Sequence, residues 1–255
     1  VCFVWVLGLA FSASSLAWAE PPKTLFTESD LALLAALGPD VIGKPIAPPS
    51  EKELIDAVLR PRTARFRVVA GEHAGKTVEV ITKKADKLPD GTHVKKPTWA
   101  VEIPGLMVQY LTVDDTGLTA PALLLRKAGL FSEHKPIEPL LLFGLAPGES
   151  KTYSTKAAAR HVSKPKEVAY DGQLAVTYRN LGAYEIKTPA GTFPGLVIRC
   201  DYVGKIGPAN LNDTGIRIYA PKIGLVALSV RDRFHAFMVL SKNVVDAMVL
   251  EEVPN

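Results

Sequence analysis

The spacing of apolar residues changes near residue 62, and this change limits the folds open to the chain. Upstream, apolar residues recur with a helical period. Downstream, they alternate with polar residues in short runs separated by glycine and proline turns. Roughly twelve such runs follow at a spacing of about ten residues, which is typical of antiparallel β proteins. The pattern predicts a mainly β fold: a curved antiparallel sheet that forms a half-barrel, a barrel or a β-sandwich.

Two short helices are expected before the sheet. The run 31–37 is apolar with acids just ahead of it, and it ends at Gly38. Ser50 and Glu53 have the spacing of a capping box, which predicts a second helix up to about Leu59. The prolines between the helices predict an extended linker. We therefore expect a leader at 1–19, a helical extension at 20–60 packed on the body, and a single antiparallel β domain at 61–255.

The leader has the features of a secretory signal peptide. Residues 1–19 carry no charge, residues 1–11 are almost entirely apolar, and Ala17-Trp18-Ala19 matches the small-residue cleavage pattern. We expect cleavage after Ala19 and a periplasmic or secreted protein. The apolar run is too short to span about 30 Å of hydrocarbon, and no transmembrane segment is expected after cleavage. Cys2 precedes the run, so a lipid anchor at the cleavage point is not expected.

The charge pattern argues against a nucleic-acid partner, and the cysteine count argues against a disulfide. The net charge is +4, but the lysines and arginines are interleaved with acids along the chain. Because no nucleic-acid-binding motif accompanies them, we expect no nucleic-acid partner. Cleavage removes Cys2 and leaves Cys200 alone, so no intramolecular disulfide can form. Cys200 lies in an alternating run, where a small buried apolar residue is the expected role.

No catalytic or metal-binding pattern stands out. The five histidines are all more than five residues apart, which gives no metal-ligand pair, and surface positions are expected for them. A G-x-S-x-G nucleophile motif is absent. Asp114 and Asp115 lie in a D-D-T-G sequence, where acids usually cap a turn through side-chain to backbone hydrogen bonds. We therefore expect no catalytic residue, no metal and no cofactor.

Two segments resemble a known group of proteins. They are PLLLFGLAPGES at 139–150, and YEIKTPAGTF at 184–193 with YAPKIGLV at 219–226 downstream. Together they resemble exported bacterial proteins of unknown function with a TapB-like β-domain. The resemblance implies a curved antiparallel sheet like that of periplasmic lipoprotein carriers, and it brings no catalytic residues. The residues themselves favour tight turns: Pro189, Gly191, Phe193, Pro221 and Gly224.

Two apolar runs carry the functional hypothesis. Residues 123–125 and 140–143 are apolar at every position, so either both faces of the strand are covered or one face lines a cavity. Plain core is the ordinary explanation. The sharper hypothesis assigns Leu123, Leu125, Leu141 and Phe143 to a ligand cavity. It predicts an exported, non-enzymatic binding protein for an apolar or lipid-like ligand. The alternatives are a structural or assembly module of the cell envelope, and an enzyme whose site is assembled from distant residues.

Overall fold

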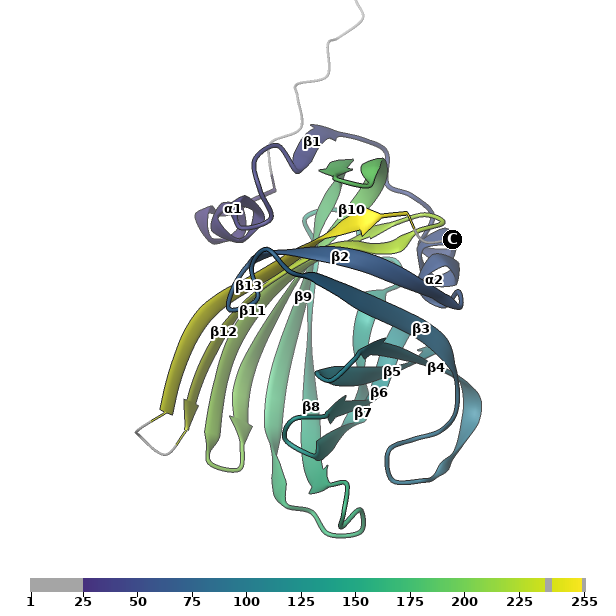
Figure 1. Cartoon of the computed structure of the whole chain (residues 1–255), viewed down its shortest axis with the longest axis vertical. Helices are drawn as coiled ribbons and strands as arrows, with labels where there is room; N and C mark the ends of the chain where they lie inside the picture. Colours follow the sequence, from purple (N-terminus) through teal and green to yellow (C-terminus); the bar gives the residue numbers. More distant parts are fainter. Residues whose placement is uncertain (1–24, 237–239, 254–255) are drawn as a thin grey trace, which may run out of the picture.

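The computed structural model describes residues 25–236 and 240–253 (Figure 1). The predicted signal peptide and its cleavage site after Ala19 lie outside the described residues. The described part consists of two short helices and one large antiparallel sheet.

Twelve strands of the described chain form a closed up-and-down barrel. Each strand pairs with its neighbours in sequence, and β13 pairs with β2. Closure removes the exposed strand edges that an open sheet would present, so of the predicted alternatives the barrel is confirmed. The strands are β2 (Arg62–Ala70), β3 (Thr77–Lys87), β4 (His93–Ile103), β5 (Met107–Asp114), β6 (Gly117–Leu125), β7 (Leu130–Leu142), β8 (Ser150–His161), β9 (Tyr170–Thr188), β10 (Gly191–Ile206), β11 (Ala209–Ala220), β12 (Gly224–Ala236) and β13 (Leu240–Glu252).

The predicted turn residues lie in the turns. The carboxylate of Asp114 accepts hydrogen bonds from the backbone N–H and the hydroxyl of Thr116, at 2.9 Å and 2.6 Å. Gly191 has a φ of +132° where β10 begins. Residues with φ in this range are strained unless they are glycine. Phe193 packs against a buried cluster of the body, as expected for a residue that re-enters the sheet.

The predicted crossing segment at 131–151 is a strand over most of its length. β7 runs to Leu142 and includes Pro136 and Pro139, with pairing irregularities opposite this stretch in β6. Pairing of β7 with β8 ends at Lys135. Proline lacks a backbone N–H, so it is tolerated where the ladder is already interrupted. The prolines therefore interrupt the pairing of β7 without ending the strand.

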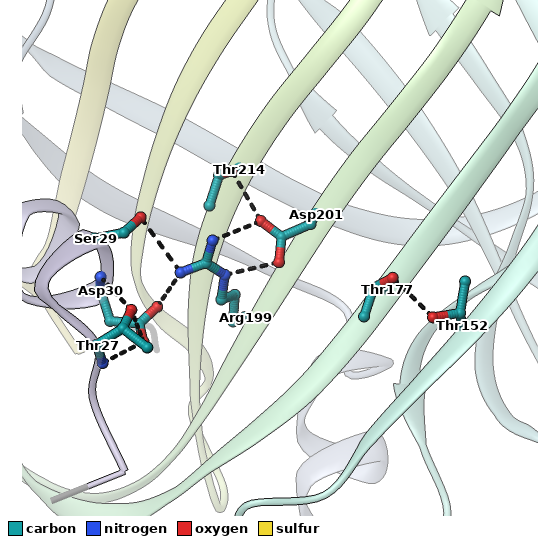
Figure 2. A network of polar contacts seen from close by, with 8 residues as sticks. All are labelled: Thr27, Ser29, Asp30, Thr152, Thr177, Arg199, Asp201 and Thr214. Carbon is teal, nitrogen blue, oxygen red and sulfur yellow. Dashed lines mark hydrogen bonds and ion pairs between the residues drawn. The ribbon is translucent and has the colours of Figure 1, made fainter.

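The first helix, α1 (Glu28–Ala35), docks on the outside of the barrel. Its capping box joins Thr27 and Asp30, and Asp30 is fully buried against β10. Figure 2 shows Arg199 of β10 between Asp30 and Asp201, with N–O distances of 2.5 Å and 2.7 Å. Burial raises the pKa of Asp30, but the hydrogen bonds from Thr27 and Arg199 outweigh burial and hold it below its ordinary value.

The segment after α1 is not a free linker. Residues Ile42–Pro45 form a short strand, β1, that pairs with the upper part of β9. The backbone N–H of Ile46 also donates to the carbonyl of Ala183. The segment is extended, as expected, and it pairs with β9 because β9 extends beyond its barrel partner β8 and leaves backbone groups for β1.

The second helix, α2 (Glu51–Val58), closes one end of the barrel. Leu54, Ile55 and Val58 are buried in its interior. The predicted capping box at Ser50 does not form, since the Ser50 side chain makes no cap hydrogen bond. Instead, the Glu51 carboxylate accepts from the backbone N–H of Gly144 at 2.8 Å, which ties the helix to the β7–β8 turn. Neither described helix is long and apolar enough to cross a membrane.

The buried contact of α1 makes a testable prediction. We expect Asp30→Asn to lower the free energy of unfolding at pH 7 by about 3 kcal/mol, because it leaves Arg199 with one fewer anion in a buried setting. Because the pKa of Asp30 is lowered on folding, its stabilisation is present above its ordinary value of 3.8 and is lost progressively as the pH falls from there through the lower pKa of the folded state. Denaturant titrations at pH 7 and pH 3.5 measure both effects.

Glu28→Gln is the matched control, since it removes the same charge from an exposed position in the first turn of α1. We expect a loss of less than 1 kcal/mol from this change. Equal losses in the two variants at pH 7 would contradict the assigned role of Asp30.

Candidate functional site

One half of the barrel interior is packed. Side chains from β5 to β11 meet those of α2 in a continuous buried cluster, which includes Leu118, Leu141, Ile198 and Tyr219. The turns at this end join β5–β6, β7–β8, β9–β10 and β11–β12. Most of the barrel interior next to α2 is therefore packed with side chains.

A buried polar layer borders this packed core. The Glu138 carboxylate on β7 accepts hydrogen bonds from the hydroxyl of Tyr178 on β9 at 3.2 Å and of Tyr202 on β10 at 2.5 Å. Arg217 on β11 donates from Nη2 to the Tyr202 oxygen at 3.1 Å and makes a longer contact from Nη1 to the Cys200 sulfur at 3.6 Å. We call these four residues, Glu138, Tyr178, Tyr202 and Arg217, the polar layer.

The polar layer holds a separated pair of charges. Burial raises the pKa of Glu138, but the contact with His134 and the charge of Arg217 outweigh burial and keep it below its ordinary value. Burial raises the pKa of Tyr202 well above its ordinary value, so its phenol stays protonated and donates to Glu138. Arg217 forms no direct ion pair with any described residue, and Tyr202 lies between the cation and the carboxylate.

The predicted surface position of His134 is wrong. This residue was expected at the surface, but it is buried beside Glu138, with Nδ1 at 3.0 Å from Oε2. This is a short contact rather than a well-aligned hydrogen bond, because Nδ1 has no partner of suitable geometry in the described structure. The cause is β7, whose alternation places His134 and Ala157 of β8 on the same inner face.

Beyond the polar layer, the inward-facing side chains are only partly buried. Tyr202 and Arg217 keep partial solvent accessibility although protein surrounds them, and so do Ile206 and Leu211 farther from α2. The register places Leu211 opposite Gly204, on the same face as Tyr202 and Ile206. We call this region, lined by Tyr202, Ile206 and Leu211, the lumen. Arg217 and Glu138 lie at its floor.

The end of the barrel opposite α2 has an apolar rim. The β6–β7 and β8–β9 hairpins lie at this end (Figure 1), and they or the residues beside them expose large apolar side chains. These rim residues are 39–50% exposed: Leu125, Val162, Val168 and Tyr170. Exposed apolar residues that gather at one opening are a feature of binding surfaces.

The structure separates the four residues predicted to line a cavity. Leu141 is 1% exposed and belongs to the core under α2, whereas Leu125 lies in the rim at the other end of β7. Leu123 is partly buried on β6. Phe143 is 42% exposed and borders a surface groove of about 550 Å³ at the β7–β8 turn. The four side chains do not share one cavity.

Sequence reasoning missed the polar layer. Arg217 lies between Ile216 and Ile218, and Glu138 lies between Ile137 and Pro139. An ionisable residue within an apolar strand is a usable signal, because such groups are buried only when they are paired or hydrogen-bonded. The signal identifies each residue singly, whereas their meeting depends on the curvature of the barrel.

Other predicted features can be placed in the described chain. Cys200 is fully buried, in agreement with the expected small core residue. Burial raises the pKa of its thiol to about 11. Within residues 25–236 and 240–253, no three histidine, cysteine or acidic side chains are grouped as metal ligands.

Comparison with known proteins gives two similar solved structures. No family model matches the chain, and no curated protein matches its sequence. A candidate lipoprotein from Parabacteroides distasonis has a TM-score of 0.38 and 12% identity, over 78% of this chain and 96% of that one. A candidate exported protein with a YmcC-like fold from Bacteroides fragilis has a TM-score of 0.40 and 12% identity, over 77% and 96%. The TapB-like resemblance stays a prediction.

The environment of Cys200 predicts an unreactive thiol. The thiolate is the reactive form, and a pKa near 11 leaves little of it at pH 8. In protein without the leader, we expect a thiol reagent at pH 8 to modify the native form at least about 100-fold more slowly than the form unfolded in guanidinium. Absorbance of the released chromophore measures both rates, and the unfolded sample serves as the control for one accessible thiol. Equal modification rates in the native and the unfolded protein would contradict the burial of Cys200.

Proposed function

We propose that this chain is an exported, non-enzymatic binding protein of the bacterial periplasm, which takes an apolar, lipid-like ligand into the lumen. The predicted signal peptide supports the compartment. The observation that carries the binding function is the partial burial of the inward side chains Ile206 and Leu211 beyond Tyr202 and Arg217. The sequence resemblance to exported TapB-like proteins agrees with this class of function.

The lumen suits a molecule with an apolar body and a polar end. Ile206 and Leu211 offer apolar surface, and the polar layer offers the cation of Arg217 and the phenol of Tyr202 at its floor. Binding sites for small molecules typically combine apolar walls with a few well-placed polar groups. An amphiphile with its polar end at Arg217 would satisfy both parts of the site.

The rim supplies a route for such a ligand. The apolar residues around the opening opposite α2 are exposed: Val162, Val168 and Tyr170. An apolar molecule that leaves a lipid phase or a carrier can therefore contact an apolar surface on its way in. The packed core under α2 excludes entry from the other end.

The chemistry of the interior favours binding over catalysis. Both phenols of the polar layer donate to Glu138, which restricts this carboxylate as a general base. Cys200, the only cysteine in the described part of the chain, is buried, and burial raises the pKa of its thiol. These groups support a site that holds a ligand rather than one that attacks it.

A second function has one observation in its favour. The groove at the β7–β8 turn lies on the outside of the barrel, and the exposed Phe143 borders it. An apolar side chain at a surface groove suits a protein contact, as expected for an assembly module of the cell envelope. A pull-down that returns one stoichiometric partner, lost in Phe143→Ser, would favour this function over ligand binding.

The lumen can be tested with a pair of matched variants. We expect the wild type to bind a fluorescent fatty acid, and Ile206→Trp to weaken the affinity at least tenfold, because the indole occupies lumen volume. Val203→Trp is the control, since Val203 lies on the same strand, on its opposite face, and is 55% exposed. Fluorescence titration measures the affinities, and circular dichroism checks that both variants fold.

Two results would overturn the binding function. The first is a wild type that takes up no fatty acid and whose native mass spectrum, after purification from its own host, shows no bound small molecule. The second is equal affinity in the Ile206→Trp and Val203→Trp variants, which would place the ligand outside the lumen.

A further inference from the structure

Arg62 is a partly buried cation whose Nη1 atom has no internal partner. It opens β2, directly after α2, and its side chain is mostly buried. Its Nη1 atom is fully buried and donates to no acceptor, and Arg62 makes no hydrogen bond or ion pair within residues 25–236 and 240–253. Burial, together with the charge of Arg60, lowers its pKa to about 10. The guanidinium is therefore still charged at neutral pH.

A small cavity adjoins this cation. It has a volume of about 40 Å³ and lies between α2 and strands β2, β3, β4 and β12. Its walls are apolar apart from Arg62 and Thr82, with Val58, Phe66, Val80 and Val101 among the lining residues. One water needs about 10–15 Å³ of such volume, so the cavity admits a monatomic ion but excludes an acyl chain or a lipid headgroup.

The turn that follows β11 is shaped around the guanidinium. Gly224 has a φ of +78°, and a Cβ at this position would collide with Nη2 of Arg62 and press on Val58 of α2. The backbone conformation favours glycine here, and a Cβ would in addition press on the backbone of Ala57 and Val58 and displace the guanidinium of Arg62. Sequence reasoning had assigned Gly224 to the turn alone.

The energetics require a compensating group. A charge taken out of water costs several kilocalories per mole unless it is paired, and arginine cannot escape the cost by losing its proton near pH 7. The carbonyl end of α2 lies close to Gly224 and offsets part of the charge. It does not provide an acceptor for Nη1. A small anion in the cavity would supply the missing charge.

We propose that this cavity is a halide-sized anion site in which Arg62 is the anchoring cation. Chloride is the ligand class that fits, because it matches the volume and needs no directed donors from the apolar walls. The site is separate from the lumen: it lies at the α2 end of the barrel, and it binds an ion whether or not a lipid-like ligand binds elsewhere.

Thermal unfolding at constant ionic strength tests the proposal in the wild-type chain without its leader. Replacing sodium gluconate by sodium chloride is expected to raise the Tm by about 2–4 °C, as binding to the folded state alone requires. Arg62→Met is expected to remove the chloride dependence. Arg60→Met removes the same charge from an exposed neighbouring residue and is expected to keep it.

A second measurement does not depend on the variants folding. Crystals of the wild type soaked in sodium bromide are expected to show an anomalous scattering peak in the cavity beside Arg62. A Tm that is insensitive to chloride, an equal chloride effect in Arg62→Met, or bromide crystals without a peak in this cavity would each overturn the proposal. None of these results bears on fatty-acid binding in the lumen.

Discussion

Residues Ser150–Ala159 of β8 pair with Tyr170–Arg179 of β9, and this pairing together with that of β13 and β2 joins the sheet into a ring. The diameter of a barrel grows with its number of strands. A ring of twelve strands therefore has a wider interior than a smaller barrel, which inward side chains alone can fill. The chain meets this constraint in two ways. It places α2 and a packed core in one end (Figure 1), and toward the other end the inward side chains of Tyr202, Ile206 and Leu211 are only partly buried.

The polar layer lies at the boundary between these two regions. A carboxylate and a guanidinium inside a barrel are costly to bury, and the cost is moderated when hydrogen bonds satisfy both groups. Tyr202 does this by accepting from Arg217 and donating to Glu138. Apolar residues of similar size would pack at least as well, so packing alone does not account for these two charges.

An arginine on the outside of the barrel is paired directly with acids, unlike the one inside. Arg199 and Arg217 belong to neighbouring strands and face opposite sides of the sheet. Arg199 is paired with Asp30 and Asp201, and it holds α1 in place (Figure 2). Arg217 faces inward and is bridged to its acid by a phenol. The same residue type thus serves docking on one face and the candidate site on the other, and only the position along each strand separates the two roles.

Much of the local structure could be predicted from the chain alone. Alternation dictates strands, because a strand buries one face with a period of two, and the acid of the Asp114 turn and the glycine at 191 set tight reversals through local hydrogen bonds and backbone freedom. The candidate site could not be predicted in the same way. Leu141 and Leu125 share an apolar pattern, yet one is core and the other is rim, because Leu141 lies at the α2 end of β7, whereas Leu125 ends β6 beside the opposite end of β7.

The sequence by itself determined the class of fold, the positions of most turns and the two short helices, since these depend on neighbours along the chain. Tertiary structure alone decided that the sheet closes, that α2 fills one end, and that Glu138, Tyr202 and Arg217 meet. Their contacts join residues 15 and 64 positions apart, and they exist only because closure curves β7 toward β10 and β11. Local pattern carries no information about that curvature, which is set by strand pairing around the whole ring.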